Sequence, residues 1–316
     1  MDSKGLGEET ARAKRGVEWI TVALMAATYL SWLIIGIWLY PVAPVLALIA
    51  LGFTVALHSS LIHEAIHGHP TRDAAINEAL MALPIGLVWP YRRYKWMHMR
   101  HHFDERLTDP FDDPESYYKA AFQHEKLPGW FKSALRINNT LLGRMILNPL
   151  IGSIGLILMD GRAVLAGDRE VIDAWVRHLA GLVVVLFVIT MFFAAPLWLY
   201  LLVPAWLGQS IIAVRTYAEH QWAESPDGRT IIVERSPLAF FFLYNNLHVV
   251  HHALPTAAWY TLPGHYRARR AEWIAKNGGY VFPNYTALMR QWLLTPKEPV
   301  IHPALRRSED DAALRP

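Results

Sequence analysis

The chain has 316 residues, of which 53% are hydrophobic and 18% are charged, and its formal net charge is +3. It contains no cysteine, so thiolate-bound zinc and cysteine-ligated iron–sulfur clusters within the chain are excluded. The small net charge and the lack of a basic block give no indication of nucleic-acid binding, and long apolar stretches point instead to a membrane.

Two uncharged stretches predict membrane-spanning helices. Residues 19–62 contain no Asp, Glu, Lys or Arg, and as helix they are long enough to cross a bilayer twice. Pro41 and Pro44 interrupt this stretch, and Pro196 interrupts a second one at residues 179–214. We therefore expect an all-α integral membrane protein whose four transmembrane helices form two hairpins. The expected spans are residues 17–40, 42–62, 176–195 and 197–214.

The remaining segments are expected to cover one side of the membrane within a single domain at residues 17–302. Residues 63–134 and 215–302 are mostly polar and should form a helical cap. Residues 135–160 are apolar but are interrupted by Asn148-Pro149 and several glycines, so we expect interfacial helices rather than a fifth span. The short apolar piece at residues 79–89 should lie at the interface or re-enter the membrane.

The two ends of the chain are expected to be tails. Residues 1–16 are polar and carry acids as well as bases, which argues against a signal peptide, and residues 303–316 are highly charged. Arg12, Lys14 and Arg15 precede the first span and Arg215 follows the fourth, whereas the predicted hairpin tips carry no Lys or Arg. By the positive-inside bias, both tails and the cap should face the cytoplasm.

Nine histidines form three clusters and one satellite beside the predicted spans. The clusters are His63-Glu-Ala-Ile-His67, His98-Met-Arg-His101-His102 and His248-Val-Val-His251-His252, and the satellite is His220. Residues at i, i+3 and i+4 share one face of a helix, so each cluster can direct its imidazoles toward one point. Imidazole suits iron, copper, zinc or nickel, and so many ligands exceed the needs of one tetrahedral zinc. Two metal ions are therefore indicated.

The histidine pattern allows three other interpretations. His63-Glu64-Ala-Ile-His67 matches HExxH, in which two histidines bind zinc and the glutamate is the general base of a peptidase. An intramembrane zinc peptidase would leave the other two clusters without a role. A soluble carboxylate di-iron bundle needs two Glu-x-x-His pairs, and only Glu64-x-x-His67 fits. A metal carrier without catalytic activity is the third alternative.

The three clusters in this order resemble the membrane fatty acid desaturase and hydroxylase superfamily. The matching segments are Leu61–His69, Trp96–Asp104 and Asn245–His252, and the resemblance covers about residues 17–265. The residues after the third cluster, 253–260, are similar to bacterial members, which implies a bacterial inner membrane with the active site on its cytoplasmic side. The first cluster has three residues between its histidines, where some acyl-CoA desaturases have four, and this weakens a direct transfer of an acyl-CoA substrate.

The resemblance implies a di-iron centre and a set of ligands. The implied ligands are His63, His67, His98, His101, His102, His220, His248, His251 and His252. Asn245 matches a position that contacts a metal-bound water in some members. Glu64, Asp104 and His69 are candidates to orient a ligand imidazole by a hydrogen bond from outside the metal sphere.

The implied activity is O2-dependent hydrogen abstraction from an unactivated C–H bond of a hydrophobic or amphiphilic substrate. Desaturation of a fatty acyl chain is expected, with hydroxylation of a lipid, an alkane-like molecule or a small amine as the alternative. The electrons should come from a separate ferredoxin, Rieske-type protein or flavin reductase. Basic residues on the cytoplasmic face could bind such a donor or meet anionic lipid headgroups: Arg92, Arg93, Lys95, Arg267, Arg269 and Arg270.

Overall fold

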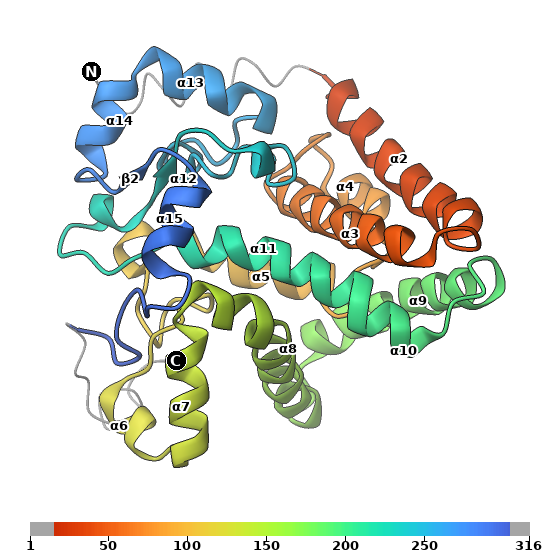
Figure 1. Ribbon diagram of the computed structural model, residues 1–316, viewed down its shortest axis with the longest axis horizontal. Coiled ribbons are helices and arrows are strands. Elements are labelled where there is room, and N and C mark those ends of the chain that lie inside the picture. The colour runs from red at the N-terminus through yellow and green to blue at the C-terminus, as the bar shows by residue number, and fades with distance from the viewer. Residues whose placement is uncertain (1–15, 304–316) are drawn as a thin grey trace.

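The computed structural model describes residues 16–303 of the chain, and almost all of its regular structure is helical (Figure 1). The predicted tails, with Arg12, Lys14 and Arg15, lie outside these residues apart from Gly16 and Pro303. The long helices are α2 (Trp19–Ile34), which continues as η1 (Ile35–Leu39), α3 (Pro44–Ile66), α8 (Leu141–Leu165), α9 (Arg169–Met191), α10 (Leu197–Tyr200), which continues as η3 (Leu201–Ala205), and α11 (Trp206–Glu219).

Shorter elements form the cap. They are α4 (Ala74–Leu80), α5 (Tyr91–His101), η2 (Asp104–Arg106), α6 (Ala121–Glu125), α7 (Gly129–Asn138), η4 (Pro226–Arg229), β1 (Ile232–Val233), η5 (Pro237–Ala239), α12 (His248–Ala253), η6 (Trp259–Thr261), α13 (Leu262–Ala268), α14 (Arg270–Lys276), β2 (Val281–Phe282) and α15 (Tyr285–Trp292).

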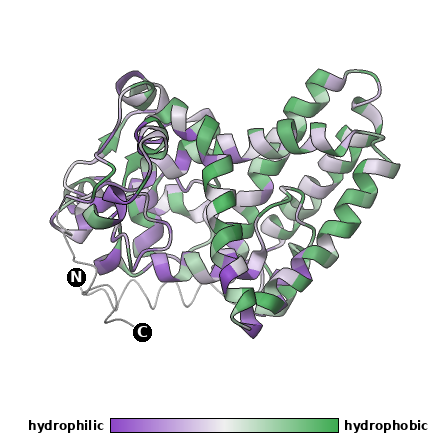
Figure 2. Ribbon diagram, turned by 90° about the horizontal axis from the view of Figure 1, so that it is seen from below, coloured by the Kyte–Doolittle hydropathy of each residue, from purple (hydrophilic) through white to green (hydrophobic). Residues whose placement is uncertain are grey.

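The two predicted hairpins are present and turn where the prolines predicted. The first helix ends at Leu39 and α3 begins at Pro44, while α9 ends at Met191 and α10 begins at Leu197. Large apolar side chains remain exposed on these helices, for example Trp38 at 69% and Val183 at 67%, as expected of surfaces that face lipid tails. Figure 2 shows the hydrophobic residues gathered on the long helices at one end of the molecule and the hydrophilic residues gathered at the other.

Helix α8 differs from the expected series of broken interfacial helices. It runs without interruption through Pro149, and it is one of five helices among the described residues that are long and apolar enough to cross a membrane. Both of its ends nevertheless contact cap-side elements, since Leu142 N–H donates to Leu293 O and Asp160 pairs with Arg93 of α5. Figure 1 shows α8 below α11, running away from it at a steep angle. Four crossings, with this segment at the membrane interface, remain a prediction.

The apolar segment at residues 79–89 is helical only as far as Leu80, and the rest of it packs among the long helices. Three of its backbone carbonyls accept hydrogen bonds from side chains of different helices. Tyr29 of α2 donates to Leu83 O at 3.4 Å, Tyr200 of α10 donates to Ile85 O at 2.9 Å, and His178 Nε2 of α9 lies 2.9 Å from Leu87 O. Such bonding is what irregular backbone requires where water is scarce.

A buried ion pair attaches α5 to two of the long helices. Arg93 of α5 lies 2.8 Å from Asp160 of α8, and Trp175 of α9 donates its indole N–H to the same carboxylate at 2.8 Å. Arg93 and Asp160 are both buried. Since removal of one partner of a buried pair leaves an uncompensated charge, this contact fixes the position of the helix that carries the second histidine cluster.

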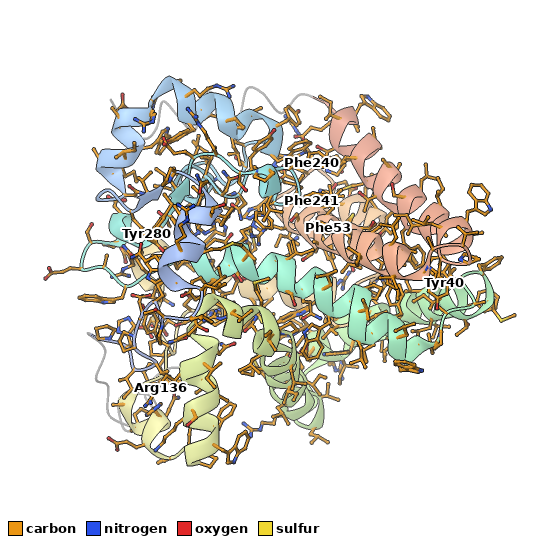
Figure 3. The ribbon with its side chains drawn as sticks, in the orientation of Figure 1. Tyr40, Phe53, Arg136, Phe240, Phe241 and Tyr280 are labelled. Carbon is orange, nitrogen blue, oxygen red and sulfur yellow. The ribbon has the colours of Figure 1, made fainter. Side chains whose placement is uncertain are left out.

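The third cluster rests on the small parallel sheet formed by β1 and β2. Asn246 accepts from Val233 N–H through its backbone carbonyl and donates from its side chain to Val233 O. His248 N–H donates to Ile231 O at 3.1 Å. On the membrane side, Phe241 packs against Phe53 of α3 with ring centroids 5.1 Å apart (Figure 3). The start of α12 is thus fixed between the sheet and the first hairpin.

The hydroxyl of Tyr200 gives a test of this packing. It accepts from the indole N–H of Trp32 at 2.8 Å and donates to Ile85 O, and the side chain is fully buried. We expect Tyr200→Phe to lower the free energy of unfolding by about 1–3 kcal/mol, because two buried polar groups lose their partner. Thermal unfolding in detergent measures this, with Tyr40→Phe at the hairpin tip as the control (Figure 3). Equal melting temperatures for the two variants would contradict the assignment.

Candidate metal centre

All nine predicted histidines lie at helix ends on the cap side of the molecule. His63 is in the last turn of α3 and His67 caps that helix. The second cluster occupies the last turn of α5, with His102 as its cap, and His220 is the cap of α11. The third cluster makes up most of α12. The histidines come from segments that are up to about 190 positions apart along the chain, and yet they meet in one region.

The imidazoles form two groups, each with its ligand atoms within 4.8 Å of one another. The five-histidine group consists of His63, His67, His98, His102 and His251, and the four-histidine group consists of His101, His220, His248 and His252. Within these groups, several Nε2 atoms lie only 2.8–3.2 Å apart. The described histidines thus fall into two groups, and the prediction that each group binds one metal ion remains a prediction.

Hydrogen bonds on the outer side of the rings fix the direction of the Nε2 lone pairs. His98 Nδ1 lies 2.9 Å from Glu115 Oε1, His101 Nδ1 lies 2.9 Å from Asp113 Oδ1, and His248 Nδ1 lies 3.1 Å from Asn245 Oδ1. An Nδ1–H that donates outward leaves Nε2 as an acceptor that faces inward. Two lone pairs that face one another at about 3 Å repel, so each such pair of nitrogens needs a proton or a metal cation between them.

The donor set fits iron. The side chains within each group are all imidazoles, which suit Fe, Cu, Zn and Ni. His63 Nε2 is buried and has no hydrogen-bond partner among the described residues, an arrangement that a metal bond would satisfy. The five-histidine group and the four-histidine group can each hold one ion, and neither includes a carboxylate.

His101 differs electrostatically from the other ligand histidines. Burial lowers the pKa of His98, His102, His248 and His251 well below the usual range, so these rings are neutral and able to bind metal. Burial also acts to lower the pKa of His101, but Asp113 and Glu115 outweigh it and raise that pKa to about 9. Metal binding at His101 would therefore release a proton, and it should weaken as the pH falls.

Two of the outer carboxylates, those of Asp113 and Glu115, belong to an acidic stretch that follows the second histidine cluster. Asp113 is buried, and its second oxygen accepts from Thr108 N–H at 2.9 Å. Glu219, which also lies beside the site, forms an ion pair with Arg215 at 2.8 Å. The positions of these acids in the sequence could have indicated their role, because Glu219 directly precedes His220 and Asp113 and Glu115 follow the second cluster. The side chain of Asp104 lies outside the part of the chain that the structure describes.

Asn245 lies beside the four-histidine group, and its contact with a metal-bound water stays a prediction. Its oxygen accepts from His248, and its amide donates to Glu219 Oε1 at 2.9 Å. The side chain therefore orients a ligand imidazole from the outer side.

Glu64 and His69 form a separate group with Glu18. Glu64 Oε1 accepts from Trp259 N–H at 2.9 Å, and His69 Nδ1 lies 2.7 Å from Glu18 Oε1. These contacts connect the start of α2 with the segment after the third cluster. Orientation of a ligand by Glu64 or His69 stays a prediction.

The predicted donor-binding residues do not form one exposed patch. Arg93 is buried against Asp160, so it is not available to a partner, contrary to its predicted role. Arg92 lies against Glu78 and Asp173, and Arg270 lies 2.6 Å from Glu234. Lys95 is half-buried, Arg269 is half-buried and Arg267 is exposed.

The long apolar helices and the grouped histidines define a membrane oxidoreductase of the desaturase and hydroxylase type. A family model described as fatty acid desaturase matches residues 35–284, which is well over half of the chain. The chain therefore belongs to the fatty acid desaturase family. No curated protein matches it with significance.

Asn245 provides a test of how the histidines are oriented. We expect Asn245→Ala to weaken metal binding by about 10- to 100-fold, because loss of an outer hydrogen bond releases the ligand ring. Metal content after dialysis against graded chelator measures this. The same exchange at Asn148, which is half-buried on α8, is the control. Retention of both ions by Asn245→Ala would show that His248 needs no such support.

Proposed function

We propose that the protein is an O2-dependent di-iron desaturase of a fatty acyl substrate. The observation that carries this proposal is the pair of histidine groups at the ends of apolar helices, in a chain of the fatty acid desaturase family. Two irons held there would activate O2 for hydrogen abstraction from an unactivated C–H bond. The overall reaction takes two hydrogens from the substrate, two electrons from a donor and two protons from solvent, and it reduces O2 to two waters.

The protein's own residues supply position and exclusion of water. His63, His67, His98, His102 and His251 would hold one iron, and His101, His220, His248 and His252 would hold the other. Asp113, Glu115 and Asn245 keep three of these rings in one tautomer. The histidines lie on the side of the membrane that the positive-inside bias assigns to the cytoplasm, and we propose the inner membrane of a bacterium as the location.

The zinc peptidase alternative receives no support from the position of Glu64. A peptidase needs this carboxylate beside the metal as its general base. Glu64 is grouped instead with Glu18 and His69, and it accepts from Trp259 N–H. The five-histidine group also contains three more histidines than HExxH supplies.

The electron donor is proposed to be a small, acidic ferredoxin, Rieske-type protein or flavin reductase that binds the outer face of α5. This face carries Lys95, Trp96, Met99 and Arg100, and the last three are exposed. The guanidinium of Arg100 lies over the Trp96 ring, 5.1 Å from its centroid. The opposite face of the same helix carries the second histidine cluster, so a protein bound here would be separated from the metals by one helix. A basic face with exposed apolar side chains suits an acidic protein partner.

The metal and the product test the activity together. Purified protein should contain two irons per chain, and cells that express it should gain a lipid or acid two mass units lighter than its precursor. We expect His251→Ala to lose at least one iron and to reduce product to background, whereas His265→Ala on α13 should retain both. One zinc per chain would support the peptidase instead. A product sixteen mass units heavier would identify a hydroxylase.

Charge reversal tests the donor site. We expect Lys95→Glu combined with Arg100→Glu to reduce donor-dependent turnover about tenfold at low salt, because electrostatic attraction accelerates association. The iron content should not change. The matched control is Arg136→Glu on α7, another exposed cation (Figure 3). If the double variant keeps the turnover and salt dependence of the parent protein, the donor binds elsewhere.

A further inference from the structure

A cavity lies beside the four-histidine group, on the cap side of α8 and α11. Its volume is about 50 Å³, whereas one water needs about 10–15 Å³ by the same measure. It is therefore large enough for a carboxylate-sized group. Its lining includes Tyr117, Asn139, Arg144, Tyr217, His220 and Lys297, and we call it the Arg144 cavity.

Arg144 is a buried cation in the lining of this cavity, and it has no carboxylate partner among the described residues. Its side chain is 3% exposed. Nε donates to Asn138 O at 2.9 Å, Nη2 donates to Asn139 Oδ1 at 3.3 Å, and the guanidinium lies 3.4 Å from the centroid of the Tyr117 ring. Nη1 is buried and has no hydrogen-bond partner in the described chain, which also places no carboxylate within 4 Å of this guanidinium. A buried charge in this state is costly unless an anion joins it.

Lys297 adds a second cation to the same cavity. Its Nζ donates to Tyr217 O at 2.9 Å and to His220 O, and these contacts use two of its three N–H groups. Both of its partners are neutral carbonyls.

The carboxylates around the cavity are already engaged with other groups. Asp113 and Glu115 accept from ligand histidines, Glu219 pairs with Arg215, and Glu298 Oε1 accepts from Trp222 N–H at 2.9 Å. None of them forms an ion pair with Arg144, so this guanidinium has no carboxylate partner among the described residues. The charges of Glu298 and Glu219 act on Lys297, the second cation of the cavity.

His220 also has an unsatisfied atom on this side. Its Nε2 lies 2.8 Å from His101 Nε2 and 2.9 Å from His248 Nε2, within the four-histidine group. Its Nδ1 is buried and has no hydrogen-bond partner among the described residues. His98, His101 and His248 each have an oxygen atom about 3 Å from Nδ1. We therefore expect Nδ1 of His220 to need an oxygen atom as well.

We propose that the Arg144 cavity binds the carboxylate group of a ligand, with Arg144 as the principal donor and Lys297 as the second cation. This proposal rests on the proposed function in one respect: we assign the carboxylate to the substrate, which would then bind as a free acid and not as a thioester. The acid can come from water as a short chain or from the bilayer as a long one. Both sources present the same group to the cavity.

Ligand binding without turnover tests the site. The full-length, iron-loaded protein is placed in nanodiscs without an electron donor, and its melting temperature is recorded as sodium chloride is replaced by sodium propionate at constant ionic strength. Propionamide is the neutral probe of matched shape. A second arm offers decanoate in the bilayer, with decanamide as its neutral probe. We expect propionate, decanoate or both to raise the melting temperature by about 2 °C or more, and the amides to have no effect.

Variants assign any shift to the cavity. We expect Arg144→Gln to weaken carboxylate binding about tenfold or more, because it removes a charge-assisted hydrogen bond. Arg136→Gln, an exposed cation on the neighbouring helix α7, should bind like the parent protein (Figure 3). If Arg144→Gln does not fold, Thr216→Leu replaces it. Thr216 lines the cavity, and the larger side chain would fill it while both cations remain.

The outcomes distinguish the source of the acid, and they distinguish failure of the site from failure of the proposed function. A shift with propionate identifies a water-soluble acid, and a shift with decanoate alone identifies an acid taken from the membrane; both support the site. Equal shifts with the amides, no shift with either acid, or unchanged binding in both Arg144→Gln and Thr216→Leu would overturn it. Carboxylate binding by a protein that holds zinc or makes no oxidised product would refute the proposed function and leave the site standing.

Discussion

The mutual repulsion of inward-facing imidazole lone pairs is the constraint on which this structure depends. Nine rings are packed so that several Nε2 atoms lie about 3 Å apart, and outer oxygens prevent at least three of the rings from turning away. Such an arrangement is stable only around positive charge. The remaining architecture can be understood as the scaffold that brings three distant clusters to one place and holds them there. The buried Arg93–Asp160 pair fixes α5, and the contacts of Asn246 with Val233 fix α12.

Irregular backbone beside the apolar helices follows a similar logic. Residues 79–89 carry carbonyl groups into a region with little water, and three of these carbonyls accept hydrogen bonds from polar side chains of the neighbouring helices. Tyr29, His178 and Tyr200 lie on helices that otherwise present apolar surfaces. Their contacts show a structural function, since they hold this segment against the helices.

Much of the fold followed from composition, because runs without charge and prolines at the tips are strong local signals. The grouping of the histidines also followed, since i, i+3 and i+4 spacing places three rings on one face. The continuity of α8 through Pro149 did not, because its contacts at both ends offset the local cost of proline. The roles of Asp113 and Arg93 did not follow either. A charge in a sequence is assumed to face water, and only tertiary contacts reveal that Arg93 meets Asp160 and that Asp113 meets His101.

The distribution of ligands between the two groups has a consequence for assembly. Helix α5 contributes His98 and His102 to one group and His101 to the other, and α12 is divided in the same way. If each group binds one ion, the loss of either ion would loosen a helix that also supplies ligands to the other ion. Uptake and release of two such ions should be cooperative, so that half-filled molecules are scarce at equilibrium and limited metal produces a mixture of full and empty chains.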